Sequence, residues 1–528
     1  MKNDSVKRHQ SLTYFLEIGL EEIPARFMPA VLADLKAQLD KSLVVHRLAF
    51  DRVQSTGTYR RLAAHIYGLA DTQADETVVT RGPAVEIGKA ADDTFLPPAI
   101  GFAKRLGLTA EQLEIRDEGG KSFLFAVVEK KGQDTEKILP AVVVDAIKAL
   151  SPPISMRWGE GQGPFIRPVH WVVSLLGHDV VPLTVFGIPA GRTTYGHRFL
   201  TRNPNTDHAI DGVPANLSSS TDYLSTTSAI FVVANANDRR EFIEDELRKH
   251  TGVRIDGDLL DEVVFLCERP TILEGRFDKT FLDLPEEVLI ETMQKHQKYF
   301  PVFAKGKLAD RFFFVADSAT PKNRATIVAG NESVLHARLS DAQFFWEADL
   351  KTPLAEYVPL LENVVFQKNT GSVGDKVRRI EKLIFDDGVG VDLTPEQAKL
   401  VRRAVRVCKA DLVTQMVKEL PKLQGIMGRY YAQKSGEAES VCHLIEQHYW
   451  PRFPGDALPV YDEAKVLGIA DRLDTLACCF ITHLMPTGSA DPWGVRRLVR
   501  GLFDLINTGP FNLELGVKNA VTLVTEKK

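Results

Sequence analysis

Hydrophobic and polar positions in the N-terminal part of the chain follow two spacings. Apolar side chains stand at about every second position in residues 11–19, which predicts a strand. Between residues 27 and 43 the apolar side chains recur every three or four positions, as on one face of a helix. A further strand is expected over 123–129 and a further helix over 136–150. These elements predict a mixed α/β body region over 12–150.

Strand and turn signals become more frequent over residues 151–330. An apolar run at 169–177 is typical of a buried strand, and 180–186 could pair with it as a hairpin. Residues 202–224 are rich in Asn, Ser, Thr, Asp and Pro, which predicts a loop. Residues 312–316 (Phe-Phe-Phe-Val-Ala) predict another strand.

Helical periodicity replaces the strand signals from about residue 331. Apolar residues recur at steps of three and four to about Leu505, so a domain boundary is placed at 325–335. The 528 residues suggest about three or four domains. We expect an α+β chain in which the strand-rich region precedes an all-helical domain over 331–505.

Composition excludes several classes of protein. Hydrophobic residues make up 44% and charged residues 26%, as in ordinary globular chains, so a disordered, collagen-like or rod-like chain is excluded. No apolar run approaches the roughly 20 residues that span a bilayer, and no membrane association is expected. The five cysteines are too few and too irregular for a disulfide framework, which favours a reducing, cytoplasmic setting.

The chain shows no complete catalytic motif. GxxxxGK[ST], HExxH, GxSxG and zinc-ligand spacings are all absent from the sequence. Gly371–Lys376 has the wrong spacing to wrap phosphates, and in Gly159–Pro164 a proline stands where a dinucleotide-binding helix should begin. His296 has no partner base or nucleophile nearby in sequence. We therefore predict no catalytic residue, and a chain that binds, positions or assembles.

Basic residues gather beside aromatic residues in several segments. The net charge is −5, from 65 basic and 70 acidic residues, which still permits a local basic face. Between Arg157 and Arg202 five arginines stand against two acids, and arginine forks fit phosphates and stack on bases. The alternative is that these arginines fix a turn-rich sheet.

Two later segments show the same mixture. On a helix from about residue 286, Lys295 and Lys298 would share the solvent side. Between residues 401 and 431 seven basic residues stand against two acidic ones, and three of them fall at helical spacing in one stripe that would attract phosphate; an ordinary solvated face is equally compatible. The candidate RNA-binding residues are Arg157, Arg167, Arg192, Arg198, Lys295, Lys298, Arg402, Arg406, Lys409, Arg496 and Arg497.

Long motifs in a fixed order run from about residue 13 to residue 510. They are Glu17–Pro24, Arg81–Pro83, Phe165–Trp171, Ala190–Arg192, Gly196–Phe199, Met293–Pro301, Ala329–Glu332, Ala337–Ala342, Lys409–Thr414, Leu423–Gly428, Ala470–Leu476 and Pro486–Ser489. Together they resemble the β-subunit family of the bacterial heterotetrameric glycyl-tRNA synthetases.

The resemblance implies a role in a two-step reaction. ATP activates glycine as an adenylate, and the acyl group then moves to the terminal ribose of tRNA(Gly). The α subunit of such enzymes holds the ATP and glycine sites and uses Mg, whereas the β subunit recognises the tRNA. Two α and two β chains are expected to assemble, with no cofactor in this chain.

The resemblance also implies a domain order, with departures. It implies a body region over 12–150, a region over 151–330 like the editing module of phenylalanyl-tRNA synthetase, and an HD-like helical domain over 331–505. It also implies an anticodon-binding domain that this chain is expected to lack, apart from its start over 506–528. Metal-binding HD domains need an adjacent His-Asp pair, but here Lys409-Ala410 precedes Asp411, so the histidine is missing. Of the expected metal ligands, only Asp411 and Asp471 are present. An HD-like fold without metal or hydrolase activity is expected. Tyr59 stands where the family usually has proline.

Three functions remain open at this point. The first is a β subunit that positions tRNA(Gly) and docks the α subunit. The second is a non-catalytic scaffold for the α subunit, and the third is an HD-type metal phosphohydrolase.

Overall fold

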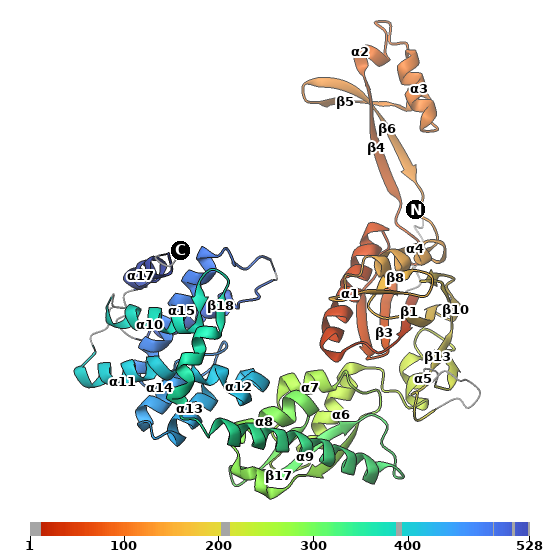
Figure 1. The fold of residues 1–528 in the computed structure, drawn as a ribbon. Helices are drawn as coiled ribbons and strands as arrows, with labels where there is room; N and C mark the ends of the chain where they lie inside the picture. The colour runs from red at the N-terminus through yellow and green to blue at the C-terminus, as the bar shows by residue number, and fades with distance from the viewer. Residues whose placement is uncertain (1–11, 202–211, 387–392, 489, 509–512, 526–528) are drawn as a thin grey trace, which may run out of the picture. The chain divides into compact units, whose positions relative to one another are not determined.

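The computed structural model describes residues 12–201, 212–386, 393–488, 490–508 and 513–525 (Figure 1). The chain divides into two compact units. Unit 1 contains the described residues up to His250, together with 255–272 and 315–321. Unit 2 contains 251–254, 273–314 and the described residues from Lys322 onward.

A seven-stranded sheet forms the centre of unit 1. Its strand order is β11-β12-β9-β1-β3-β2, with β10 pairing to β9. The central strand β1 pairs antiparallel to β3 and β9, and Ile18 stands opposite Leu62 and Val172. The strands span Leu12–Leu20 (β1), Arg52–Thr58 (β2), Arg61–Leu69 (β3), Val169–Leu176 (β9), Asp179–Val180 (β10), Thr184–Val185 (β11) and Ile188–Gly191 (β12).

The predicted N-terminal elements are present in the sheet and beside it. Every residue of β1 from Tyr14 to Leu20 is buried, because neighbouring strands flank it on both edges and its two faces are covered. Helices α1 (Met28–Val45) and α4 (Thr135–Lys148) pack on each other, and α1 also packs on β2. The expected strand at 180–186 is interrupted because Pro182 lacks the N–H that a ladder needs.

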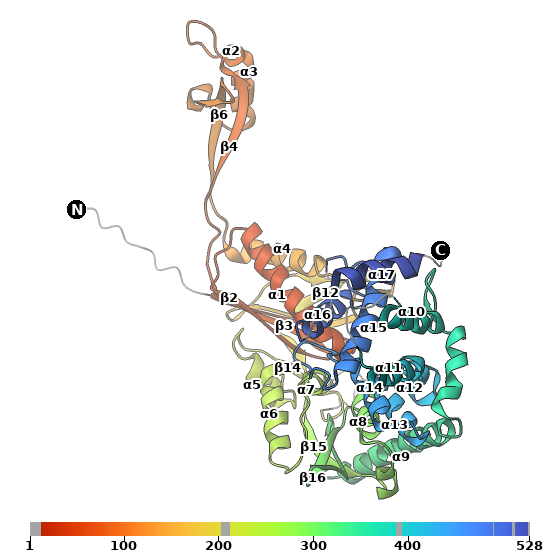
Figure 2. The same ribbon diagram turned by 90° about the vertical axis from the view of Figure 1, so that its left-hand side faces the viewer.

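A smaller three-stranded sheet has its own core. Its order is β4-β6-β5, and the elements are drawn in orange in Figures 1 and 2. Helix α3 covers it through Ala99, Phe102 and Ala103, which pack against Leu124 and Ala126. We call this group, residues 76–130, the β4–β6 module; its elements are β4 (Glu76–Ala84), α2 (Val85–Gly88), α3 (Pro97–Arg105), β5 (Glu114–Glu118) and β6 (Lys121–Lys130).

Short elements complete unit 1. Of the loop predicted at 202–224, residues 202–211 lie outside the described residues, and the rest holds a short strand and a helix start. Helices α6 and α7 each begin at a side-chain cap, Asn235 and Asp256, which accept backbone N–H groups. These elements are β7 (Met156–Trp158), β8 (Gln162–Phe165), β13 (Thr193–Tyr195), β14 (Pro214–Asn216), α5 (Tyr223–Ala229), α6 (Ala236–Arg248) and α7 (Gly257–Val263).

A second three-stranded sheet leads into the helical part of the chain. Its order is β15-β17-β16, with β15 at Thr271–Arg276, β16 at Phe300–Ala304 and β17 at Lys307–Ala316. The strand predicted at 312–316 is therefore confirmed as part of β17. Helix α8 (Glu286–Glu291) continues into a π-helical turn at Thr292–His296.

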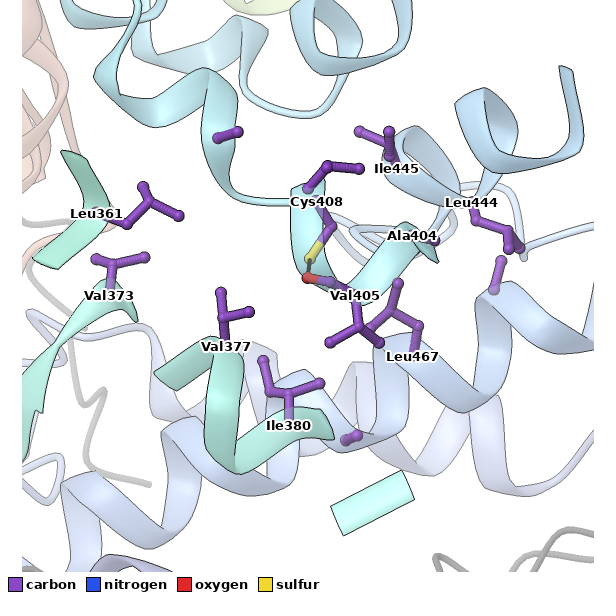
Figure 3. Packing of buried hydrophobic residues seen from close by; sticks show 14 of the residues in the cluster. Leu361, Val373, Val377, Ile380, Ala404, Val405, Cys408, Leu444, Ile445 and Leu467 are labelled. Atoms are coloured by element: carbon purple, nitrogen blue, oxygen red, sulfur yellow. Dashed lines mark hydrogen bonds between the residues drawn. The ribbon is translucent and has the colours of Figure 1, made fainter. Parts of the chain in front are cut away.

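Helices dominate unit 2 from residue 324, as predicted. Buried side chains of α10, α11, α14 and α15 share one core, in which Cys408 donates to the carbonyl of Val405 (Figure 3). The helices are α9 (Arg324–Asp349), α10 (Val373–Phe385), α11 (Pro395–Val407), α12 (Gln415–Glu419), α13 (Ile426–Lys434), α14 (Glu439–Gln447), α15 (Asp462–Ile481), α16 (Val495–Ile506) and α17 (Leu513–Thr525).

The expected all-helical character needs one correction. Two short strands, β18 (Val365–Gln367) and β19 (Gly371–Ser372), pair antiparallel before α10. Asn369 and Gly371 both have positive φ, 78° and 94°, which allows the tight reversal between them. Helix α17 contributes Ala520 and Leu523 to the same core as α10 and α15.

Two further observations bear on the setting. None of the described helices is long and apolar enough to cross a membrane. All five cysteines are described, buried and outside any disulfide: Cys267, Cys408, Cys442, Cys478 and Cys479.

Candidate functional site

Three of the predicted RNA-binding arginines in unit 1 hold backbone carbonyls. Arg157 donates to two carbonyl oxygens of the turn that follows it, at 2.9 and 3.2 Å. Arg167 donates to the carbonyl of Glu22 at 2.8 Å, and Arg192 to that of Leu217 at 3.3 Å. These contacts favour the alternative that arginines fix turns. A guanidinium has five N–H donors, however, so each still has donors for a ligand.

Arg198 lies close to Arg167 through a shared neighbour. Its guanidinium pairs with the Glu22 carboxylate at 2.6 Å and lies 4.7 Å from the ring centre of Phe199. Arg167 holds the backbone of the same Glu22. The structure therefore brings Arg167 and Arg198 together from two separate motifs, which the sequence could not indicate.

Lys295 and Lys298 do not share one helical face, and that prediction is wrong. Helical structure ends at His296, and Lys298 has a φ of 59°. The chain must leave the helix here because β16 begins at Phe300, before a proline that disfavours helical geometry in the preceding residue. Lys295 is exposed and donates to the Glu419 carbonyl at 2.8 Å.

Arg402 and Arg406 lie together on the exposed face of α11. Their guanidinium groups both contact one oxygen of Glu381, at 3.2 and 3.3 Å, and their side chains are about half exposed. A single carboxylate thus faces two positive charges. Arg496, in the first turn of α16, is exposed and donates to the Gly488 carbonyl at 2.6 Å; Arg497 is exposed beside it.

Lys409 does not belong to that stripe, which corrects the predicted grouping of three. Helix α11 ends at Val407, and the turn that follows directs Lys409 inward, where its side chain is 4% exposed. Its ammonium contacts Asp471 Oδ2 at 3.0 Å and His448 Nε2 at 2.9 Å. Lys409 is therefore unavailable to an RNA backbone in this structure.

Lys409 is part of a buried ionic cluster that also contains Lys376, His448, Asp471 and Asp474; we call it the lysine cluster. The Lys376 ammonium lies 2.9 Å from Asp471 Oδ1 and 3.2 Å from Asp474 Oδ2. Burial alone would raise the pKa of Asp471, but the two ammonium groups hold that pKa well below its usual range. Each oxygen of Asp471 therefore faces one lysine.

His448 is neutral in this cluster. Burial and the neighbouring Lys409 charge lower the pKa of His448 well below its ordinary value. An ammonium only donates, so Nε2 accepts from Lys409 and the proton resides on Nδ1, which donates to the Leu444 carbonyl at 3.2 Å. In the described part of the chain, no group of three or more His, Cys, Asp or Glu side chains could hold a metal ion.

Asp411 is buried outside the lysine cluster. Its Oδ2 accepts the backbone N–H groups of Gly425 and Gly428 at 2.6 and 3.1 Å, while Oδ1 has no hydrogen-bond partner. Burial raises the pKa of Asp411 to about 6, more than these donors and Lys409 lower it. The Asp411 carboxylate thus stabilises the turn before α13 through these two hydrogen bonds. It is partly protonated in mildly acidic solution.

We predict a pH-dependent difference between the wild type and Asp411→Asn. The folded pKa exceeds that of an unfolded aspartate, so burying the charge costs stability above pH 6, and this cost is relieved as the pH falls through about 6 toward 4. Asparagine has no such dependence. Between about pH 7.5 and about pH 4.5, the unfolding free energy of the wild type should rise relative to the variant by about 2 kcal/mol.

Urea unfolding of both proteins at several pH values measures this difference. Asp341→Asn, an exposed carboxylate on α9, is the control and should leave the pH dependence of the wild type unchanged. A constant difference between the wild type and Asp411→Asn across this pH range would contradict the prediction.

A second buried ionic cluster lies in unit 1 and was missed by the sequence analysis. Arg61 of β3 is fully buried and donates through Nε to Glu268 at 2.7 Å and through Nη1 to Glu17 of β1 at 3.2 Å. Trp171 and Tyr223 each donate to Glu17 at 3.0 Å. We call these five residues the Arg61 cluster. A charged residue within the apolar run of β1 was the signal that could have revealed it.

The unusual Tyr59 lies beside this cluster. Its hydroxyl donates to Asp317 Oδ2 at 2.8 Å, and the buried His197 ring places Nε2 at 3.1 Å from the same oxygen. Asp317 in turn accepts the backbone N–H of Glu268. Tyr59 therefore helps to fix the backbone that presents Glu268, and it connects that backbone with the Gly196–Phe199 motif.

His296 has a carboxylate neighbour that sequence distance concealed. It lines a cavity of about 110 Å³ with Arg338, Asp341 and Glu419, and its Nε2 lies 3.8 Å from the Glu419 carboxylate. Burial, with Lys295 and Arg338, lowers the pKa of His296. Two motifs far apart in sequence, Met293–Pro301 and Ala337–Ala342, therefore meet at this cavity.

Comparison with known proteins identifies the class. A family model described as the glycyl-tRNA synthetase beta subunit matches residues 14–527. The chain is thus a subunit of the aminoacyl-tRNA ligase class, and it belongs to the glycyl-tRNA synthetase β-subunit family. This confirms the resemblance found in its motifs.

Individual relatives agree. A glycine–tRNA ligase beta subunit of Moorella thermoacetica is 40% identical over 516 residues, which is 97% of this chain and 72% of the relative. Those of Shouchella clausii and Clostridioides difficile are each 39% identical, over 97% and 93% of this chain and 73% and 70% of their own lengths.

Proposed function

We propose that this chain binds and positions tRNA(Gly) and docks the α subunit of a glycine–tRNA ligase. The reaction is ATP + glycine + tRNA(Gly) giving glycyl-tRNA(Gly) + AMP + diphosphate, with the ATP, Mg and glycine sites on the α subunit and two chains of each kind in the assembly. The observation that carries the proposal is the family match across residues 14–527.

The exposed basic groups support a contribution through binding energy. Arg402 and Arg406 face one carboxylate, so their surface keeps an excess of positive charge that phosphates can neutralise with release of counterions. Holding the tRNA end near the adenylate can lower the barrier by several kcal/mol, on the order of 7 or more in well-oriented cases. No nucleophile in this chain is needed for that effect.

The domain assignments are part of the proposal. The mixed body over 12–150, an editing-module-like region over 151–330 and an HD-like domain over 331–505 remain predictions. They are supported by the order of the motifs and by the helical character of the last part of the chain.

The lysine cluster weighs against the alternative of a metal phosphohydrolase. The space between His448 and Asp471 is taken by the Lys409 ammonium, and the other Asp471 oxygen faces Lys376. A divalent cation placed there would meet two positive charges at close range. These residues do not fit a metal, and elemental analysis of the purified chain should find no stoichiometric Mn, Fe or Mg.

Filter binding of tRNA(Gly) tests the proposed function. The affinity of this chain for tRNA should fall steeply as salt rises, because phosphate contacts release counterions. Mixed with the α subunit, the chain should support glycine charging, whereas alone it should make no glycyl-adenylate. Salt-independent or absent tRNA binding, or adenylate synthesis by the isolated chain, would contradict the proposal.

The double variant Arg402→Gln/Arg406→Gln separates tRNA positioning from a pure scaffold. We expect tRNA affinity to fall about tenfold and the salt dependence to become shallower, with α-subunit assembly unchanged. Arg452→Gln is the control, because that exposed arginine also pairs with a carboxylate, Asp456, and lies in the loop between α14 and α15. Lost assembly with intact tRNA binding would favour the scaffold alternative.

A further inference from the structure

The cavity beside His296 collects charged side chains that no proposed contact uses. It lies where α9, α12 and the π-helical turn after α8 meet, and its volume is about 110 Å³. That volume is several times the roughly 10–15 Å³ that one water needs, but it is well below the roughly 300–1,000 Å³ of pockets for drug-sized ligands. The cavity therefore suits a ligand of a few heavy atoms and is too small for a nucleotide.

Three elements direct their charged side chains toward this cavity. On α9, Arg338 and Asp341 are three residues apart, and on α12 so are Met416 and Glu419. Residues at this spacing lie on the same side of a helix, and all four line the cavity together with His296. Arg338 lowers and Glu419 raises the pKa of His296, which places both charges close to the ring.

The charges on the lining are available to a ligand. The Glu419 side chain is half exposed, and its carboxylate lies 3.8 Å from His296 Nε2, beyond hydrogen-bond distance. Among the described residues, Arg338 and Asp341 form no ion pair, although their spacing on one helix allows one. An ordinary pair of surface charges therefore does not account for their presence at the cavity.

His296 contributes a neutral ring whose position depends on an uncommon backbone. Burial, together with Lys295 and Arg338, lowers the pKa of His296, so the ring is uncharged near neutral pH. Its inaccessible Nδ1 has no hydrogen-bond partner in the part of the chain that the structure describes. The ring ends the π-helical turn 292–296, and such turns are rare and occur frequently at functional sites.

The signs of the lining charges select the kind of ligand. A simple anion would meet the carboxylates of Asp341 and Glu419. A metal ion would meet the Arg338 guanidinium, and the described residues provide no group of three metal ligands. A small molecule that carries one charge of each sign can face both the guanidinium and the carboxylates, and the zwitterion of an α-amino acid is such a molecule.

We propose that this cavity binds a small α-amino acid as its zwitterion, with the carboxylate on Arg338 and the ammonium between Asp341 and Glu419. Glycine is the smallest such ligand. The site is separate from the glycine substrate site that the proposed function places on the α subunit, so the inference goes beyond that function. A charged side chain of a bound protein is the competing occupant.

The test is a titration of ¹³C-labelled glycine with the full chain, followed by ligand-observed NMR in the absence of the α subunit. Glycine should bind with a Kd on the order of 1 mM, as expected for so small a ligand. Methylamine and acetate each carry only one of the two charges. Each should bind at least about tenfold more weakly than glycine, because one charged contact is missing.

Variants of the lining should change this selectivity in opposite ways. Arg338→Gln removes the partner of the carboxylate, so glycine should bind no more tightly than methylamine. Asp341→Asn/Glu419→Gln removes the partners of the ammonium, so glycine should bind no more tightly than acetate. All three positions are exposed, so the fold should persist in both variants.

Arg324→Gln is the matched control. It replaces another exposed arginine of α9 that does not line the cavity, about 21 Å along the helix from Arg338. At physiological salt a charge at that distance is screened, so the Kd for glycine should change less than about twofold.

Three results would overturn the inference. They are absent glycine binding by the wild type, glycine binding that Arg338→Gln leaves unchanged, and methylamine or acetate binding as tight as that of glycine. If Arg338→Gln keeps glycine binding but loses assembly with the α subunit, the cavity has a protein occupant and the inference is likewise wrong. Absent tRNA(Gly) binding in the filter assay refutes the proposed function and leaves this inference standing.

Discussion

Replacing Arg61 by methionine should destabilise unit 1 by about 3–5 kcal/mol at neutral pH. The substitution leaves Glu17 and Glu268 buried without their shared cation, and both side chains are fully inaccessible to solvent. Leaving a buried carboxylate unpaired costs far more than losing an exposed ion pair, whose median contribution is about 0–1 kcal/mol. Urea unfolding followed by pulsed hydrogen exchange in peptides from β1 and β3 measures the change in unit 1 separately from unit 2.

The pH dependence of this effect has a defined sign. In the wild type, burial would raise the pKa of Glu268, but Arg61 and Arg60 outweigh it and lower that pKa. The resulting stability is present above the unfolded pKa and is lost as the pH falls through the folded value. Without Arg61 the pKa of Glu268 should rise instead. The difference in unfolding free energy between the wild type and Arg61→Met should therefore become smaller as the pH falls into the acidic range.

Two further variants check the cause. Arg52→Met removes an exposed arginine of the same sheet, which lies over the Tyr67 ring, and should cost no more than about 1 kcal/mol. Arg61→Met/Glu268→Gln should recover part of the loss, because one unpaired charge disappears. A double variant as unstable as the sum of its single changes would show that packing, and not charge, sets the cost.

Replacing Lys409 by methionine should destabilise unit 2 by about 3 kcal/mol or more. Asp471 keeps Lys376 but loses one of its two ammonium partners, and the acceptor nitrogen of His448 loses its donor. Each of these losses is costly because the groups are buried, so water cannot take the place of the missing ammonium. Urea unfolding followed in peptides from α11 and α15 gives the magnitude.

The same variant distinguishes a buried lysine from an RNA-binding one. Under conditions where Lys409→Met remains folded, its tRNA affinity should show the wild-type salt dependence, unlike that of Arg402→Gln/Arg406→Gln. Lys418→Met, an exposed lysine on α12, controls for the loss of one positive charge from unit 2 and should leave its stability nearly unchanged. A stability change of Lys409→Met as small as that of the control would refute the role of the lysine cluster.

The sequence predicted elements whose cause is local. The apolar runs of β1 and β9 and the periodicity of α1 and α4 each depend on residues within one segment, and all four appear in the structure. The break after β10 was missed because Pro182 was not weighed against its apolar neighbours. A buried strand accepts apolar residues in any sequence, but a proline has no backbone N–H to donate to the neighbouring strand, so the pairing stops there.

The candidate site could be predicted less well, because the direction in which a side chain points and the residues it pairs with depend on parts of the chain far away in sequence. Periodicity placed Arg402, Arg406 and Lys409 in one stripe, but no glycine or proline marks the end of α11 two residues before Lys409. Arg61 and Glu268 are 207 residues apart, so their pairing depends on how unit 1 folds.

The buried thiols offer a native set of chemical probes. Burial raises the pKa of Cys267 and of Cys408 to about 12, so neither is a thiolate near neutral pH and both resist alkylation while the fold is closed. Cys267 belongs to unit 1, and Cys408 and the three others belong to unit 2. The rate at which each thiol is modified therefore reports how often its own unit opens. A cysteine introduced on the surface can be labelled with a dye while the native cysteines stay in place.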